Sequence, residues 1–172
     1  MEKNLIHKTY QLPALILVFL VLALAGLTTS SPALADATPS SLGMSKGQTL
    51  YVPAYSHIYI GHKATPYKLT VTLSIRNIDP DLPFTLFAVD YHGTEGSLIK
   101  HYLDKPITIA PMATARYVVP SPDKTGGSGA NFIVKWNSTT PLNPPIVEAI
   151  MIGTQSQQGI SFTSRGQEIL KK

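Results

Sequence analysis

The sequence predicts an all-β protein, an antiparallel β-sandwich of immunoglobulin-like type preceded by an N-terminal hydrophobic signal helix. A small β-barrel is the alternative. Many short stretches alternate apolar and polar residues, and 14 prolines and 12 glycines spread along the chain end these stretches at short intervals. No stretch after the N-terminal region has the periodicity of an amphipathic helix. Short strands separated by frequent turns are typical of sandwiches and small barrels.

The composition excludes several classes of protein. Apolar residues make up 44% of the chain and charged residues only 14%, the opposite of a disordered chain. The net charge is +4, and the basic residues are scattered, with one adjacent pair at Lys171 and Lys172. A nucleic-acid partner needs a basic stripe, so none is expected. Because the chain has no cysteine, disulfides, thiolate metal sites and cysteine nucleophiles are excluded.

The N-terminal region has the three parts of a secretory signal peptide. Lys3 and Lys8 precede an apolar run at residues 12–27, and a polar stretch then leads to Ala33-Leu34-Ala35. We predict a signal peptide at residues 1–35, with cleavage that leaves Asp36 as the first residue and exports the protein to a bacterial periplasm or cell surface. The alternative is an uncleaved membrane anchor at residues 12–27, although the run is shorter than the roughly 20 residues that span a bilayer.

The mature chain is expected to form a flexible lead-in at residues 36–47 and a single β-sandwich domain at residues 48–172. Its first strand signal is "LYVPAYSHIYI", residues 50–60, in which apolar residues alternate with rings. On a straight strand, alternate residues would form a row of rings on one face. This row consists of Tyr51, Pro53, Tyr55, His57 and Tyr59. Pro53 cannot donate to a sheet, so the strand should lie at an edge or bend there.

The row of rings has two interpretations. Rings with polar tips suit stacking on sugars or covering the apolar surface of a partner. Alternatively, tyrosine simply favours strands and packs against its neighbours there.

The next strands follow from alternation and turn residues. In "YKLTVTLSIR", residues 67–76, the buried face should be Leu69, Val71, Leu73 and Ile75. After a turn at residues 77–83, "FTLFAVDY" is apolar on both faces, as in a central strand, and "HGTEG" forms a hairpin loop before "SLIKHYL". Further strands are predicted at residues 106–109, 115–119, 131–136 and 146–153, with a proline-rich connection at 137–145 that cannot be helical.

The stretch "GTQSQQGISFTSRGQ", residues 153–167, contains one more strand, since Ile160 and Phe162 alternate with polar residues. An amide-rich loop precedes that strand. Gln155, Gln157 and Arg165 offer groups that could bind a sugar hydroxyl or a carboxylate. The alternative is a terminal strand with ordinary polar turns.

No catalytic or metal motif is present, and no cofactor is expected. No two of His57, His62, His92 and His101 have the spacing of a zinc motif. Ser128 lies in "TGGSGAN", but the residue two positions on is Ala130, so this is not a nucleophile elbow. We therefore expect no enzymatic activity; the remaining alternative is a site assembled from residues far apart in the sequence.

Several segments together resemble one bacterial family. They are "GQTLYVPAYSHIY", "LSIRNIDP", "YLDKPITIAP", "TGGSGANFIVKW" and, most distinctively, "MIGTQSQQGISFTSRGQ". This chain is similar over residues 46–168 to the family called domain of unknown function 3124. The resemblance implies an exported, single-domain protein without an assigned activity, and it supplies no catalytic residue. Some members of that family begin with a lipid-attachment cysteine, which this chain lacks.

These observations favour a non-enzymatic periplasmic or cell-surface module that binds a glycan or an envelope protein. Its expected contacts are Tyr51, Tyr55, His57, Tyr59, Gln155, Gln157 and Arg165. The alternative is a structural or assembly module of the cell envelope that pairs through exposed strand edges, anchored by an uncleaved N-terminal helix.

Overall fold

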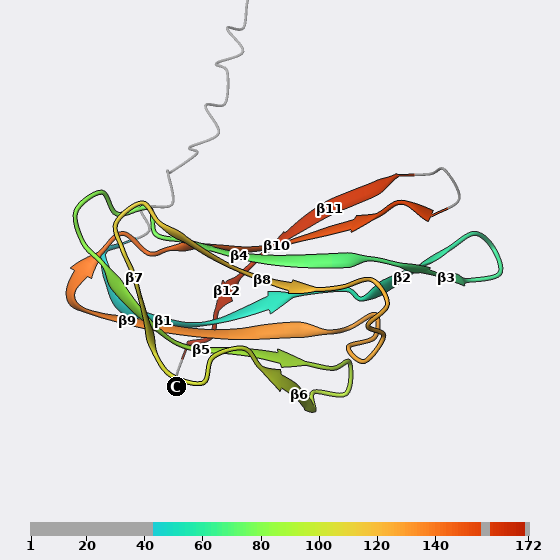
Figure 1. Ribbon diagram of the computed structural model, residues 1–172, viewed down its shortest axis with the longest axis horizontal. Helices are drawn as coiled ribbons and strands as arrows, with labels where there is room; N and C mark the ends of the chain where they lie inside the picture. The colour runs from blue at the N-terminus through green and yellow to red at the C-terminus, as the bar shows by residue number, and fades with distance from the viewer. Residues whose placement is uncertain (1–42, 156–158, 171–172) are drawn as a thin grey trace, which may run out of the picture. The chain divides into compact units, whose positions relative to one another are not determined.

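The computed structural model describes residues 43–155 and 159–170, which form two antiparallel sheets and a hairpin (Figure 1). The predicted signal peptide, its cleavage site at Ala33, Ala35 and Asp36, and the anchor at residues 12–27 lie outside the described residues. The first strand begins at Ser45, before the expected end of the lead-in at Gly47. Within the described part of the chain, no helix has the length and apolar character needed to cross a membrane.

The larger sheet has the strand order β12-β1-β9-β5-β6, and β7 also pairs with β5. Its strands are β1 (Ser45–Pro53), β5 (Phe84–His92), β6 (Leu98–His101), β7 (Ile107–Ile109), β9 (Asn131–Leu142) and β12 (Gln167–Glu168). The strand β5 lies between β9 on one side and β6 and β7 on the other, which confirms the central position predicted for "FTLFAVDY".

The smaller sheet has the order β11-β10-β4-β8, and a separate hairpin pairs β2 with β3. The four strands of the sheet are β4 (Thr70–Arg76), β8 (Thr114–Val119), β10 (Ile146–Gly153) and β11 (Ile160–Arg165). The hairpin consists of β2 (His57–Ile60) and β3 (Thr65–Lys68). Every pairing among the described strands is antiparallel.

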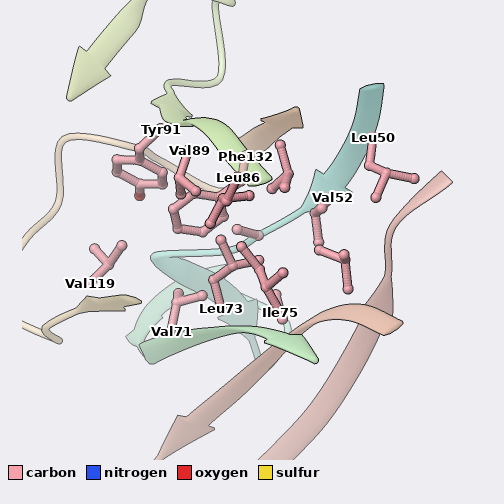
Figure 2. Close-up of a cluster of buried hydrophobic side chains, with 14 of the residues drawn as sticks. Leu50, Val52, Val71, Leu73, Ile75, Leu86, Val89, Tyr91, Val119 and Phe132 are labelled. Carbon is pink, nitrogen blue, oxygen red and sulfur yellow. The ribbon is translucent and has the colours of Figure 1, made fainter. Parts of the chain in front are cut away.

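The core lies between the two sheets because each strand turns one set of alternate residues inward. Figure 2 shows Val71, Leu73 and Ile75 of β4 facing the apolar side chains of the larger sheet, among them Val89 and Phe132. These five side chains are fully buried. The prediction of an all-β sandwich is confirmed, and the alternative of a closed barrel is wrong.

The strand order does not confirm the immunoglobulin-like connectivity. Constant-type immunoglobulin domains place their first two strands in one sheet and their last two strands in the other. Here the last two strands, β11 and β12, lie in different sheets, and the hairpin β2–β3 belongs to neither sheet.

Three predicted elements have different bounds in the structure. The strand predicted at residues 67–76 is divided between β3 and β4 at Leu69, whose amide donates to Ser56 O at 3.0 Å. The strand predicted at residues 50–60 ends at Pro53 and resumes at His57. The predicted connection at 137–145 is partly strand, because β9 continues to Leu142, which pairs with Ser45. The register shifts between these pairs, so Pro141 interrupts no regular ladder.

Candidate functional site

Parts of the two stretches singled out from the sequence meet at one end of the sandwich. The rings of Tyr55 and Phe162 are 5.7 Å apart in an edge contact. The backbone amide of Gln155 donates to the hydroxyl of Tyr67 at 2.9 Å, and Ser164 Oγ donates to Pro53 O. Figure 1 shows the hairpin β2–β3 and the linked ends of β10 and β11 at the same end of the molecule. We call the region formed by Tyr55, His57, Tyr59, Gln155 and Phe162 the aromatic corner.

A bend after β1 separates the hairpin from the rest of the strand. The amide and the hydroxyl of Ser56 both donate to Gly127 O, at 3.1 and 2.9 Å, and Ser56 is buried. These two hydrogen bonds from Ser56 turn the chain away from the line of β1. The predicted rings therefore do not form one continuous row. Tyr51 stays on β1, opposite Ile133, and is 39% exposed. It lies outside the aromatic corner.

His57, which is half-buried, and Tyr59, which is exposed, form a pair on β2. Their rings meet edge to face at 5.2 Å, and Nε2 of His57 lies 3.3 Å from the hydroxyl of Tyr59. Tyr59 is 56% exposed, whereas Ile58 and Ile60 on the opposite side of the strand pack against the core. The pair therefore presents an apolar ring surface whose polar tips can exchange hydrogen bonds with a ligand.

The polar residues predicted in the C-terminal stretch divide between two places. Gln155 is tied to the corner through its backbone, since Tyr67 also donates to Gln155 O at 3.4 Å. Gln157 lies outside the described residues. Arg165 is exposed on β11, three residues beyond Phe162, so the two side chains face opposite sides of the sheet. Arg165 therefore lies outside the corner.

Arg165 instead belongs to the outer face of the smaller sheet. It lies opposite Glu148 of β10. Glu148 forms a long ion pair with Arg76 of β4, with 3.6 Å between Nε and Oε1. Glu148 thus has Arg76 as its ion-pair partner and Arg165 as its register neighbour on β11.

The aromatic corner has a positive electrostatic bias. Neither residues 54–69 nor residues 153–165 contain an aspartate or a glutamate. Lys68 lies opposite His57 in the hairpin, and His62 and Lys63 lie in the exposed turn between β2 and β3. A ligand that carries negative charge or many hydrogen-bond acceptors would meet donors here and no fixed negative charge from these segments.

The histidines that the structure describes do not gather into a metal site. Among the residues that the structure describes, no group of three His, Asp or Glu side chains could hold a metal ion. His101 of β6 lies 2.7 Å from Asp90 of β5, and His92 lies 3.0 Å from Gly96 O in the hairpin loop. The partner of Asp90 is therefore the histidine across the hairpin, not His92 in the same strand.

A buried hydroxyl, that of Tyr91, is closed off from solvent. Burial raises the pKa of Tyr91 to about 12, with a smaller contribution from the charge of Asp123. Among the described residues this hydroxyl has no hydrogen-bond partner at hydrogen-bonding distance and angle. A Cβ placed on Gly126 would lie 1.9 Å from the Tyr91 oxygen. The glycine loop thus packs directly on this hydroxyl and leaves no room for a substrate.

One member of the corner, and one residue that supports it, were not predicted as site residues. Phe162 was visible as an aromatic side chain in an otherwise polar stretch, which is a usable signal. Tyr67 gave no signal, because its role depends on contact with a backbone 88 residues further along the chain.

The match to a family model agrees with the sequence-based resemblance. The family model described as "Protein of unknown function (DUF3124)" matches residues 47–169. None of the curated proteins matches the chain. Among solved structures, "Crystal Structure of Thermotoga maritima 1070" is 10% identical, with a TM-score of 0.44 over 72% of this chain and 96% of that one. Because the family model spans more than half of the sequence, the chain belongs to the DUF3124 family of proteins of unknown function.

Proposed function

We propose that this protein is an exported, non-enzymatic binding module whose aromatic corner contacts a glycan or an envelope protein. The observation that carries the proposal is the convergence of two distant segments on one ring pair. Tyr67 and Gln155, 88 residues apart, fasten the hairpin to the end of β10, and beside them His57 and Tyr59 are held in an edge-to-face contact. The signal-peptide pattern at residues 1–35 supports the exported location.

The chemistry of the corner favours recognition over reaction. Ring faces contribute apolar contact at a small cost in side-chain entropy, and the hydroxyl and imidazole tips exchange hydrogen bonds. The nearby lysines and the absence of acids in both segments favour hydroxyl, carboxylate or phosphate groups on the partner. These groups are common on glycans and on acidic protein surfaces.

The test is a comparison of Tyr59→Ala with Tyr51→Ala in a glycan array and in a pulldown from envelope extract. Both tyrosines are exposed, by 56% and 39%, so neither change should alter the free energy of unfolding by more than about 0.5 kcal/mol. We expect Tyr59→Ala to weaken binding by about tenfold or more, the effect of losing a central aromatic contact. Tyr51→Ala should bind as the wild type does.

Two results would contradict the proposal. The first is wild-type binding by both Tyr59→Ala and His57→Ala. The second is an equal loss in Tyr51→Ala, which would place the contact on the larger sheet.

An assembly module is the second candidate, and one observation favours it. The smaller sheet ends in β8 on one side and β11 on the other, and neither outer edge pairs with another described strand. Free edges are templates for a strand from a second chain. Light scattering on the purified protein, alone and with envelope extract, tests this candidate. A strict monomer that captures no envelope partner contradicts it.

A further inference from the structure

The larger sheet carries a groove that is separate from the aromatic corner. One depression of about 500 Å³ is lined by Gly47, Gln48, Thr49, Phe87, Lys135, Trp136, Asn137, Glu168, Ile169 and Leu170. A second, of about 250 Å³, is lined by Pro83, Phe84, Thr85, Thr108, Asn137, Ser138 and Thr139. Both include Asn137, so they adjoin each other, and we call them together the sheet groove.

A β-bulge puts an aromatic side chain into the first depression. Leu86 pairs with Trp136 and Ala88 pairs with Lys135, which leaves Phe87 as the extra residue of β5. Leu86 is fully buried, but Phe87 is 44% exposed. Bulges re-aim side chains and occur often beside functional sites. The exposed ring adds an apolar face to the first depression, against which the ring face of a ligand could pack.

A row of small uncharged residues crosses the sheet beside this ring. Gly47, Asn137, Thr85 and Thr108 are register neighbours on β1, β9, β5 and β7. Three strand spacings of about 4.8 Å give this row a length of about 14 Å. At its start, a Cβ on Gly47 would lie 2.7 Å from Trp136 O, so only glycine allows this close approach. The remaining residues supply an amide and two hydroxyls.

The groove has two charged residues, Glu168 and Lys135, and both line the first depression. Glu168 accepts from Gln48 Nε2 at 2.9 Å, and Gln48 Oε1 accepts from Trp136 Nε1 at 3.3 Å. Beyond Glu168, the amide of Ile169 donates to Thr49 O at 2.8 Å, which holds Ile169 and Leu170 at the rim. These two apolar side chains are 45% and 79% exposed. The second depression is lined by uncharged residues alone, so its hydrogen-bonding groups are neutral.

We propose that the sheet groove binds a neutral oligosaccharide. One sugar ring stacks on Phe87, and hydroxyls of the following units bond to Asn137, Thr85 and Thr108. An exposed ring with a few placed amide and hydroxyl groups suits a ligand that is itself apolar on its ring faces and polar at its edges. A peptide that extends a sheet needs a free edge, whereas this groove runs across paired strands. A single-stranded nucleic acid needs cations along its path, and this row has none.

The test is a titration of the full chain, followed by backbone NMR, with neutral hexasaccharides of glucose, mannose, xylose and N-acetylglucosamine. An oligogalacturonate serves as the acidic contrast. At least one neutral hexasaccharide should shift the amides of Phe87, Asn137 and Thr108. Phe87→Ala should weaken its binding by about tenfold or more, and Asn137→Ala should weaken it measurably.

Two controls separate this inference from the proposed function. Leu98→Ala removes a side chain that is 46% exposed on the same sheet, outside the groove, and Tyr59→Ala alters only the aromatic corner. Both should bind the hexasaccharide as the wild type does. The inference is overturned if no neutral hexasaccharide shifts the groove amides, if only the acidic oligosaccharide binds, or if Phe87→Ala and Asn137→Ala both bind normally.

Discussion

Asp79, in the turn after β4, is the one buried charged residue among those the structure describes. Its Oδ1 accepts from the amides of Asp81 and Leu82, at 3.1 and 2.9 Å, and its Oδ2 accepts from the amide and the side chain of Asn143, both at 3.1 Å. The carboxylate therefore links this turn to the connection between β9 and β10. A buried carboxylate is tolerated because donors satisfy both oxygens.

Asp79 should make stability depend on pH. The hydrogen bonds from the amides of Asn143, Leu82 and Asp81 lower its pKa from the ordinary value of 3.8. The folded state then binds this proton less readily than the unfolded state, so the stabilisation is complete above pH 3.8 and is lost as the pH falls through the lower folded pKa. Asp79→Asn should reduce the urea midpoint at neutral pH, because an amide nitrogen would face the donors of Asn143.

The matched control for that prediction is Asp81→Asn, which changes an exposed carboxylate two positions away. It should unfold at the wild-type midpoint and keep the wild-type loss of stability in acid, whereas Asp79→Asn should lose part of that acid dependence. Urea unfolding of the three proteins across the acid range measures both effects. If Asp79→Asn keeps the wild-type urea midpoint at neutral pH, the hydrogen bonds to the Asp79 carboxylate contribute nothing to stability.

Individual buried residues could be predicted where the alternation is regular. Leu69, Val71, Leu73 and Ile75 were expected on the inner face, and all four are fully buried. The exposure of Phe87 could not be predicted, because a bulge moves a residue out of the alternation and depends on the partner strand. The sequence showed only that "FTLFAVDY" has apolar residues on both of its faces.

At the scale of elements, the hairpin β2–β3 depends on a few contacts for its position. It pairs with neither sheet, and its ties include Ser56 to Gly127 and Tyr67 to Gln155. Tyr67 is buried and holds the end of β10 through its hydroxyl, which accepts from one backbone group of Gln155 and donates to another. These contacts therefore fix the position of His57 and Tyr59 on β2, although neither residue takes part in them.

Tyr67→Phe should loosen this end of the molecule. Removing the hydroxyl leaves the Gln155 amide without that acceptor, and the loss should cost about 1 kcal/mol of unfolding free energy. Hydrogen exchange at Gln155 should become faster than in the wild type, because the local opening becomes easier. Tyr102→Phe is the matched control, since Tyr102 donates to Val118 O at 3.2 Å elsewhere in the fold. If the Gln155 amide exchanges at the same rate in Tyr67→Phe and Tyr102→Phe, the hydrogen bond between Gln155 and Tyr67 does not hold this end of the molecule.

The predicted ends of the strands agree with the structure where turn residues are frequent. They differ from it where the end of a strand depends on pairing with a distant strand. The loop between β5 and β6 and the strands β8 and β10 lie close to their predicted positions. The sequence predicts the bend at Pro53, because proline has no amide hydrogen to donate to a neighbouring strand. It does not predict the hydrogen bonds that the buried Ser56 makes to Gly127 O. The extension of β9 to Leu142 depends on pairing with Ser45, almost a hundred residues away in sequence.

At the scale of the whole molecule, two sheets enclose a core without disulfides, and the candidate contacts lie on different parts of the surface. The sequence predicts the two-layer architecture, because the alternation of apolar and polar residues within each strand shows which side chains face inward. It could not predict that Tyr55 meets Phe162 while Tyr51 and Arg165 lie elsewhere, since strand order decides which distant segments meet. The site could therefore be predicted as a set of residues, but not as a surface.

The central claim is that this β-sandwich works outside the cytosol. Intact-mass spectrometry of the protein recovered from fractionated native cells tests it most directly. The account predicts a chain that begins at Asp36 in the periplasmic or surface fraction. A full-length chain in the membrane fraction would support the anchored alternative, still outside the cytosol. Recovery of the full-length chain from the cytosolic fraction would contradict the account.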